Sequence, residues 1–229
     1  MKKSILITGC SSGLGLALTH LYLEKGYKVF GISRQKPNIS NNDFIFKSSN
    51  LSDTSEIKNN LTSFIAEIIN LETVYLNAGT LGKIKEMTQL KLDDLKDTMD
   101  LNVYANKELL DILSTIKVQN IIAISSGAAV NGSKGWGPYS LSKASLNMLI
   151  NLYAKEMIDT KLLCVAPGVI KTAMTDFIRN EVDDTVYTSA KVLKEGVIQT
   201  PVDAAKRLYE VTNKIQIFDS GTFIDVRNI

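Results

Sequence analysis

A buried strand, a glycine-rich turn and an apolar helical segment follow one another at the beginning of this chain. Residues 3–8 contain the apolar run SILIT, and glycines at positions 9, 13 and 15 come directly after it. Apolar residues at helical spacing then continue to about Gly26, which predicts the end of the helix. Backbone N–H groups at the start of such a helix suit a pyrophosphate. The same glycines are also compatible with an ordinary tight turn.

Six more short apolar segments follow, and most are separated by a segment with helical spacing. Strands that alternate with helices in this way pair in parallel, with helices on the faces of the sheet. We therefore expect a Rossmann-like, doubly wound sheet of seven parallel strands in a three-layer α/β/α arrangement, whose last strand closes an edge. The expected strands are residues 3–8, 27–32, 44–46, 73–76, 121–124, 161–166 and 222–226.

The composition is that of one globular domain spanning residues 1–229. A chain of 229 residues with 45% hydrophobic and 22% charged residues can form a single α/β core. The net charge of +2 and the lack of a long basic run argue against nucleic acid or a membrane surface as a partner. Two cysteines, Cys10 and Cys164, and one histidine are too few for a disulfide framework or a metal centre, so we expect no metal.

The chain also contains no segment of the ~18 apolar residues that a membrane span needs. Two lysines precede the first apolar run, but that run is too short for the core of a secretion signal. The two cysteines are then expected to be small buried side chains in a reducing compartment. The sequence therefore predicts a cytoplasmic protein.

Residues 121–149 join a buried strand, a glycine-rich loop and a helix. Ser125 and Ser126 end the strand, at the edge of an open α/β sheet where ligands bind. Tyr139 and Lys143 stand four residues apart near the start of the helix, so they share one helical face. A nearby ammonium lowers the pKa of a phenol from about 10, and such a phenol can give a proton to a carbonyl oxygen. A serine hydroxyl beside it can hold that oxygen.

The same tyrosine and lysine spacing also occurs on solvated helix faces, and this chain contains a second example. Tyr187 and Lys191 are four residues apart as well. Met174 stands thirteen residues before Tyr187, whereas Ser126 stands thirteen residues before Tyr139. No buried strand leads into the second pair. The strand and the serine therefore favour the first pair as the functional one.

Ser126, Tyr139 and Lys143 resemble the catalytic signature of the classical short-chain dehydrogenases/reductases. The resemblance covers nearly the whole chain, with the motifs in the family's order. It implies reduction of a carbonyl by hydride transfer from a nicotinamide, with Tyr139 as the general acid and Ser126 fixing the carbonyl. Lys143 would lower the pKa of Tyr139 and hold the nicotinamide ribose. In the family, an asparagine in a segment like MDLNVYA, here Asn102, distorts its helix and holds a proton-relay water.

Further motifs of the family predict the residues around a dinucleotide cofactor. TGCSSGLG resembles its glycine-rich fingerprint, and PGVIKT resembles its Pro-Gly-x-x-x-Thr segment. LNAG resembles Asn-Asn-Ala-Gly, whose second asparagine, here Asn77, braces the neighbouring strand. Asn50 stands where relatives carry an acid against adenine. The resemblance implies cofactor contacts from Gly9, Ser11, Ser12, Gly13, Leu14, Ser33, Arg34, Asn50, Leu51, Asn77, Ala78, Gly79, Tyr139, Lys143, Pro167, Gly168, Val169, Ile170 and Thr172.

The end of the second strand favours NADP(H) over NAD(H). In NAD-binding Rossmann units an acidic side chain here accepts from the ribose 2′-hydroxyl, whereas an arginine accommodates a 2′-phosphate. Ser33 and Arg34 follow the strand, Lys36 adds a second cation, and no carboxylate stands between Lys25 and Asn42. A guanidinium can bind a phosphate with two hydrogen bonds. The alternative is a surface arginine that only ends the strand, and Ser12 stands where many NADP-dependent relatives carry a basic residue.

Three further local predictions follow from the residue pattern. Residues 173–200 mix apolar and charged residues without one clean period, and we expect a substrate lid there, because long insertions in compact domains often cover active sites. Pro201 predicts the start of the last helix. Asp53 and Glu56 have the spacing of a capping box, which predicts a helix that continues to Ile69.

Within the family, SSGAAVNGSKGWGPYSLSKASLNML and PGVIKTAM are most similar to the sepiapterin reductase and benzil reductase group, which reduces aryl or vicinal dicarbonyl compounds with NADPH. The resemblance therefore implies an NADPH-dependent carbonyl reductase for a small ketone or vicinal dicarbonyl. It also implies a homodimer or homotetramer paired through residues 91–114 and 139–158. The alternative is a non-catalytic NADP(H)-sensing protein on the same fold. A Rossmann methyltransferase is disfavoured, because it would need an acid after the second strand.

Overall fold

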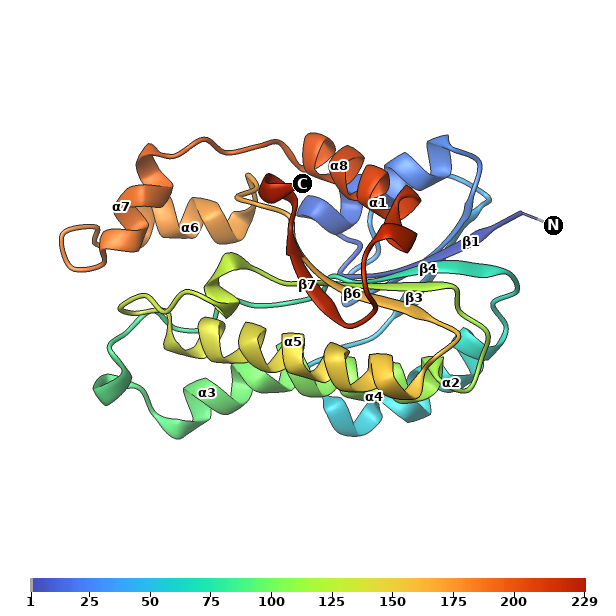
Figure 1. Cartoon of the computed structure of the whole chain (residues 1–229), viewed down its shortest axis with the longest axis horizontal. Coiled ribbons are helices and arrows are strands. Elements are labelled where there is room, and N and C mark those ends of the chain that lie inside the picture. The colour runs from blue at the N-terminus through green and yellow to red at the C-terminus, as the bar shows by residue number, and fades with distance from the viewer. Residues whose placement is uncertain (1) are drawn as a thin grey trace.

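Seven parallel strands form the centre of the molecule (Figure 1). The computed structural model describes residues 2–229. The strand order is β3-β2-β1-β4-β5-β6-β7, and each neighbouring pair is parallel. This confirms the predicted doubly wound α/β sheet, including the last strand at an edge. The strands are β1 (Ser4–Thr8), β2 (Lys28–Ser33), β3 (Phe44–Ser48), β4 (Leu71–Leu76), β5 (Asn120–Ile124), β6 (Lys161–Ala166) and β7 (Thr222–Asp225).

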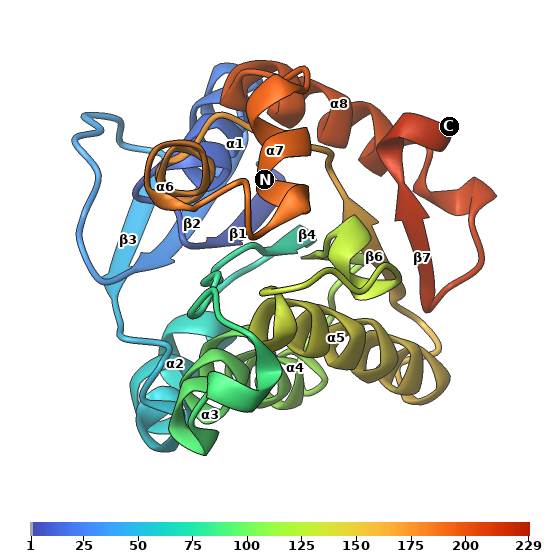
Figure 2. The same cartoon turned by 90° about the vertical axis from the view of Figure 1, so that its left-hand side faces the viewer.

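Helices cover both faces of this sheet. Helices α1 (Gly13–Glu24) and α8 (Pro201–Asn213) lie on one face, and α2 (Ile57–Ala66), α4 (Ala105–Leu113) and α5 (Gly137–Glu156) lie on the other (Figure 1). Helix α3 (Leu92–Met99) precedes α4. Helices α6 (Ala173–Glu181) and α7 (Thr188–Glu195) lie beyond the carboxyl ends of the strands (Figure 2). Within residues 2–229, no helix is long and apolar enough to cross a membrane.

The five central strands are largely buried on both faces, whereas the edge strands β3 and β7 are only partly buried. Successive side chains of the central strands enter different layers. In β1, Leu6 packs on the side of α2, α4 and α5, whereas Ile5 and Ile7 pack on the side of α1 and α8. The same alternation occurs in β5 with Ile121 and Ile122. Parallel strands between two helical layers have nearly continuous apolar sequences, which explains why they could be predicted from the sequence.

One predicted helix is interrupted. Residues 91–114 form α3, a π-helical turn (Asp100–Tyr104) and α4. Asn102 lies buried in this turn, and its side chain forms two hydrogen bonds with the backbone of Thr80. The Thr80 N–H donates to Asn102 Oδ1 and Asn102 Nδ2 donates to the Thr80 carbonyl, each at 2.8 Å. The π-turn confirms the helix distortion that the resemblance implied, and such turns frequently mark functional sites.

The predicted capping box at Asp53 is wrong. The Asp53 carboxylate caps no backbone N–H and instead accepts a hydrogen bond from the Ser55 hydroxyl at 2.8 Å. Serine side chains compete for such groups near helix starts. A short 3-10 turn (Thr54–Glu56) therefore precedes α2, which ends at Ala66 rather than at Ile69.

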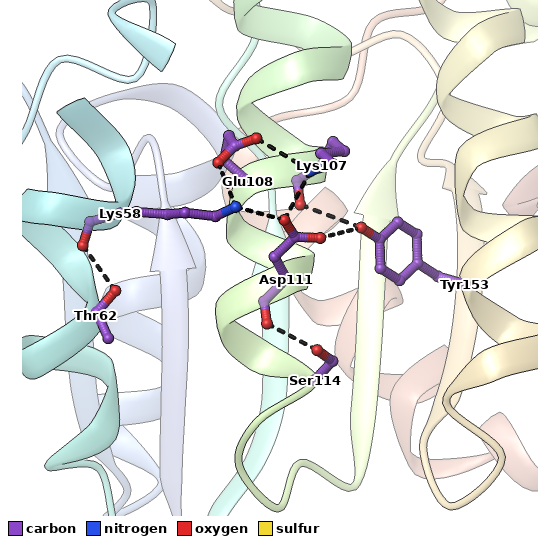
Figure 3. Close-up of polar contacts among 7 residues, drawn as sticks. All are labelled: Lys58, Thr62, Lys107, Glu108, Asp111, Ser114 and Tyr153. Carbon is purple, nitrogen blue, oxygen red and sulfur yellow. Dashed lines mark hydrogen bonds and ion pairs between the residues drawn. The ribbon is translucent and has the colours of Figure 1, made fainter. Parts of the chain in front are cut away.

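A network around Asp111 ties α2, α4 and α5 together on the outer surface (Figure 3). Asp111 accepts hydrogen bonds from Lys58 at 2.8 Å, from Lys107 at 2.7 Å and from the Tyr153 hydroxyl at 2.5 Å. Partial burial raises the pKa of Asp111, but these three donors outweigh it and hold the pKa well below its usual range. The network therefore stabilises the packing of the three helices while Asp111 is charged.

Asp111→Asn is expected to lower the free energy of unfolding by about 1–2 kcal/mol at neutral pH, because the charged acceptor of three donors is lost. A carboxylate with a lowered folded pKa stabilises above its unfolded pKa of about 4, and this contribution is lost as the pH falls through the folded pKa. Urea unfolding at neutral and acidic pH measures both values. The matched control is Ser114→Ala, because the Ser114 hydroxyl contacts only the Asp111 backbone carbonyl. A penalty for Asp111→Asn that does not shrink in acid would contradict this account.

Candidate active site

A cleft of about 720 Å³ opens at the carboxyl ends of the strands, a volume typical of ligand-binding clefts. Figure 2 looks onto this edge, with α6 and α7 on one side and α3 and α5 on the other. Ligands of open α/β sheets bind there because the loops after the strands meet there. All the residues predicted to contact a cofactor line this cleft. Ser126 lines it as well, whereas Asn102 lies buried behind its wall.

The turn after β1 brings bare backbone to the floor of the cleft. Gly9 and Gly13 have positive φ angles of 68° and 53°, which favour glycine. A Cβ atom on Gly9 would lie only 3.0 Å from the Cα atom of Ala78, so the β1 and β4 loops approach closely. Asn77 Nδ2 donates to the Thr8 carbonyl at 2.9 Å, which confirms the predicted bracing of the neighbouring strand. The resulting turn at the N-terminus of α1 can receive phosphate groups.

Tyr139 and Lys143 meet at the end of β5, next to Ser126. Lys143 is buried, and its ammonium donates to the carbonyl oxygen of Ile124 at 2.7 Å. Its Nζ lies 5.7 Å from the centroid of the Tyr139 ring. Ser126 follows two residues after β5 in an extended conformation, and its hydroxyl accepts from the Ala128 N–H at 3.2 Å. The chain therefore brings a hydroxyl, a phenol and an ammonium to one end of the cleft.

The expected lowering of the Tyr139 pKa by Lys143 is not found. Burial raises the pKa of the Tyr139 phenol, and interaction with the Ser126 hydroxyl lowers it only in part. Burial also lowers the pKa of Lys143 to about 8. Both shifts have the same cause, because a low-dielectric surrounding disfavours the phenolate and the ammonium alike. The sequence shows the pairing of these groups but not how deeply the fold encloses them.

Asn102 connects to the same region through hydrogen bonds. Asn102 Nδ2 donates to the Ser142 hydroxyl at 2.9 Å, and that hydroxyl donates to the Tyr139 carbonyl at 2.8 Å. Gly79 lies beside both Asn102, which was predicted to hold the relay water, and Lys143. A Cβ atom on Gly79 would lie 3.1 Å from Asn102 Oδ1 and 3.5 Å from Lys143 Nζ. The lack of a side chain there leaves room beside both groups, and the relay water itself stays a prediction.

The second tyrosine and lysine pair is not part of the cleft lining. The Tyr187 ring packs closely against Gly135, and Lys191 is exposed on α7. Tyr187 packs against the same apolar cluster as Tyr139, but only the first pair lines the cleft, in agreement with the preference that the preceding serine and strand indicated.

Sequence reasoning missed the apolar wall of the cleft. It is formed by Leu81, Trp136, Met174, Ile178 and Leu193. We call these five residues the apolar wall. Residues 173–200 were expected to cover the site. Their apolar residues do not follow one helical period, because the segment forms two short helices, so the sequence did not show which side chains face the cleft. Trp136 could have been found, since it stands three residues before Tyr139 and so falls on the same helical face.

Arg34 lines the cleft at the end of β2 and is exposed. Among residues 2–229, no carboxylate forms an ion pair with it. Asn50 also lines this end of the cleft, and its Oδ1 accepts from the Ser52 N–H at 3.3 Å. An uncompensated guanidinium beside an amide can bind an anionic group of a ligand.

Comparison with known proteins identifies relatives. Residues 3–183 match a family model described as short chain dehydrogenase. A benzil reductase ((S)-benzoin forming) of Bacillus subtilis is 32% identical, over 76% of this chain and 77% of its own length. An NADPH-dependent pterin aldehyde reductase of Arabidopsis thaliana is 27% identical, over 75% of this chain and 76% of its own length. These relatives confirm the predicted similarity to the benzil and sepiapterin reductase group.

Solved structures share the fold. A short chain dehydrogenase family protein from Francisella tularensis superposes with a TM-score of 0.85 at 21% identity, covering 98% of this chain and 97% of that one. The structure of ElxO with NADP bound superposes with a TM-score of 0.80 at 23% identity, covering 99% of this chain and 97% of that one.

Proposed function

Because this chain belongs to the short-chain dehydrogenase family, we propose that it is an NADPH-dependent reductase that converts a small ketone or vicinal dicarbonyl compound to an alcohol. The observation that carries the proposal is the meeting of Ser126, Tyr139 and Lys143 at one end of the cleft. The similarity to a benzil reductase and a pterin aldehyde reductase supports a carbonyl substrate. No observation favours the sensing alternative.

The residues present fit a dinucleotide phosphate. The bare turn at Gly9 and Gly13 would receive the pyrophosphate at the N-terminus of α1. Glycine is required at position 9, because a Cβ atom there would lie 3.0 Å from the Ala78 Cα atom. Arg34 would bind the 2′-phosphate with its free guanidinium, which favours NADP(H) over NAD(H). The bound cofactor would supply the hydride for the carbonyl carbon.

The residues of the chain supply orientation and a proton. The Ser126 hydroxyl holds the carbonyl oxygen, and Tyr139 donates its phenol proton to that oxygen as the general acid. Burial keeps Tyr139 protonated until this step, which is the form that an acid needs. The Lys143 ammonium then stabilises the phenolate left on Tyr139. The apolar wall surrounds the substituents of the carbonyl, so we propose an apolar or aryl substrate.

The proposal is tested by mixing the protein with NADPH and benzil and following the absorbance of the reduced nicotinamide. We expect the absorbance to fall and benzoin to form. A titration of NADPH alone, followed by protein fluorescence, measures binding separately. Binding without any oxidation across a panel of ketones, diketones and pteridines would support the sensing alternative and remove the reductase proposal.

The charge of Lys143 gives this reaction a pH dependence. Burial lowers the pKa of Lys143 to about 8, so the ammonium is present below that pH and is lost above it. We expect kcat/KM for reduction to fall as the pH rises through about 8. In Lys143→Arg the guanidinium stays charged, so its residual activity should show no such fall. The same fall in parent and variant would assign the titration to another group.

The assembly of the chain stays a prediction. Helix α5 exposes Leu141, Met148 and Leu152 along one face. This stripe is compatible with the predicted homodimer or homotetramer, and light scattering of the purified protein would decide between a single chain and an assembly.

A further inference from the structure

Trp136 supplies the only N–H donor among the side chains of the apolar wall. We infer that its indole N–H binds the second carbonyl oxygen of a vicinal dicarbonyl substrate, so that Trp136 selects dicarbonyl compounds over simple ketones. This inference rests on the proposed function, because it places the first carbonyl at Ser126 and Tyr139.

Among the residues that the structure describes, none forms a hydrogen bond with the indole nitrogen of Trp136. Trp136 is 7% exposed, and its Nε1 atom is buried without an acceptor among residues 2–229. Buried tryptophan N–H groups usually find a partner, since a buried donor left unpaired costs about 1–3 kcal/mol. The unpaired donor therefore needs an explanation, and an acceptor that a substrate brings is one.

The surroundings of Trp136 contain few acceptors. Its ring belongs to an apolar cluster with Leu81, Ile178, Val182 and Ala190. The last three come from α6, the residue after it and α7. These hydrocarbon side chains cannot accept the proton, and the Tyr139, Tyr187 and Met174 side chains at the edge of the cluster form no hydrogen bond with the indole among residues 2–229. An oxygen brought by a molecule in the cleft that Trp136 lines can serve as the missing partner.

Trp136 also lies beside the proposed acid. The Trp136 and Tyr139 ring centroids are 6.3 Å apart, and the ring planes meet at 62°. A vicinal dicarbonyl carries its two oxygens on adjacent carbons, so one oxygen at Tyr139 leaves the other close by. A simple ketone has only the first oxygen and would leave the indole donor unpaired. The dicarbonyl is therefore expected to bind more strongly than the simple ketone by the free energy of one hydrogen bond.

The segment that covers Trp136 is anchored at both of its ends. The Lys171 N–H donates to the Gln199 carbonyl at 3.0 Å, and the Gln199 N–H donates to the Val169 carbonyl at 3.1 Å. Helices α6 and α7 lie between these anchors, and Ile178 and Ala190 from them pack against Trp136. A substrate beside Trp136 would therefore also lie against the predicted lid.

The kinetic test compares benzil with deoxybenzoin, which has the same two aryl groups but a single carbonyl. Trp136→Phe keeps an aromatic ring and removes the donor. We expect kcat/KM for benzil to fall about 3- to 10-fold and that for deoxybenzoin to change little, as one neutral hydrogen bond implies. Equal changes for both substrates, or no change for either, would overturn the inference. If the parent protein reduces neither compound, the proposed function fails instead.

A second measurement needs no turnover. The chain has one tryptophan, so a ¹H–¹⁵N spectrum contains a single indole N–H signal, which is that of Trp136. With NADP+ present, we expect benzil to move the proton of this signal downfield, as a new hydrogen bond does, and deoxybenzoin not to do so. An equal shift with both compounds, or none with benzil, would overturn the inference.

Ser189 provides the control for this signal. Its hydroxyl lies on α7 next to Ala190, and the oxygen is also buried without a hydrogen-bond partner in the described part of the chain. A small movement of α7 could offer this oxygen to the indole. We expect Ser189→Ala to leave the indole signal of the protein without ligand unchanged. A change in that signal would mean that Ser189 already accepts the indole proton, which would overturn the inference.

Discussion

Replacing Tyr139 with phenylalanine is expected to lower kcat/KM for carbonyl reduction by about 10²- to 10⁴-fold, which is the usual contribution of a positioned general acid. The variant keeps the ring that packs against Trp136 and loses only the hydroxyl beside Ser126. The affinity for NADPH should therefore stay within a few-fold of the parent value. Steady-state kinetics with benzil and a fluorescence titration with NADPH measure the two quantities.

Tyr187→Phe is the matched control for this prediction. It removes a hydroxyl from the second tyrosine and lysine pair, which has the same spacing but does not line the cleft. We expect it to keep nearly the parent activity. Tyr139→Phe with parent-like turnover would show that another group donates the proton. A loss in both variants would point to a structural effect of the hydroxyls.

Arg34→Ala is expected to weaken NADPH binding by roughly 10- to 100-fold and to leave NADH binding nearly unchanged. A hydrogen bond from a charged group contributes about 1.5–3 kcal/mol, which corresponds to this range. Arg34 has an exposed guanidinium at the end of β2, and NADH lacks the 2′-phosphate that it would bind. Dissociation constants for both cofactors, measured at fixed low salt, give the comparison.

Lys36→Ala is the control for the cofactor measurement. Lys36 is a second exposed cation two residues away, but it does not line the cleft. We expect this variant to bind NADPH almost as the parent does. An Arg34→Ala variant that loses NADPH and NADH affinity equally would mean that Arg34 supports the loop and does not read the phosphate. Equal losses in both variants would indicate only a general electrostatic attraction.

The sequence was sufficient to predict that the site residues lie together at one edge of the sheet. Polar or small residues directly follow buried runs at Gly9, Ser33, Asn77, Ser126 and Pro167, and parallel strands bring all these positions to one edge. The burial of the five central strands also followed from their apolar runs, because helices cover both faces of the sheet there. The edge strands β3 and β7 are only partly buried.

Other features depend on contacts between distant parts of the chain. The raised pKa of Tyr139 comes from enclosure by the fold, and no local motif reports how complete that enclosure is. The apolar wall joins Leu81 after β4, Trp136 before α5 and Ile178 in α6, three segments that are far apart in the sequence. The predicted capping box at Asp53 does not form, and the Ser55 hydroxyl donates to the Asp53 carboxylate instead.

The central claim is that this chain transfers hydride from NADPH to a carbonyl carbon while Tyr139 protonates the oxygen. The most direct test is the reduction of benzil with NADPH that carries deuterium at both hydrogen positions of nicotinamide C4, followed by mass spectrometry of the alcohol. We expect benzoin that carries one deuterium on its carbinol carbon, formed by the parent protein and nearly absent with Tyr139→Phe. Benzoin without deuterium, or no benzoin while NADPH is bound, would contradict the account.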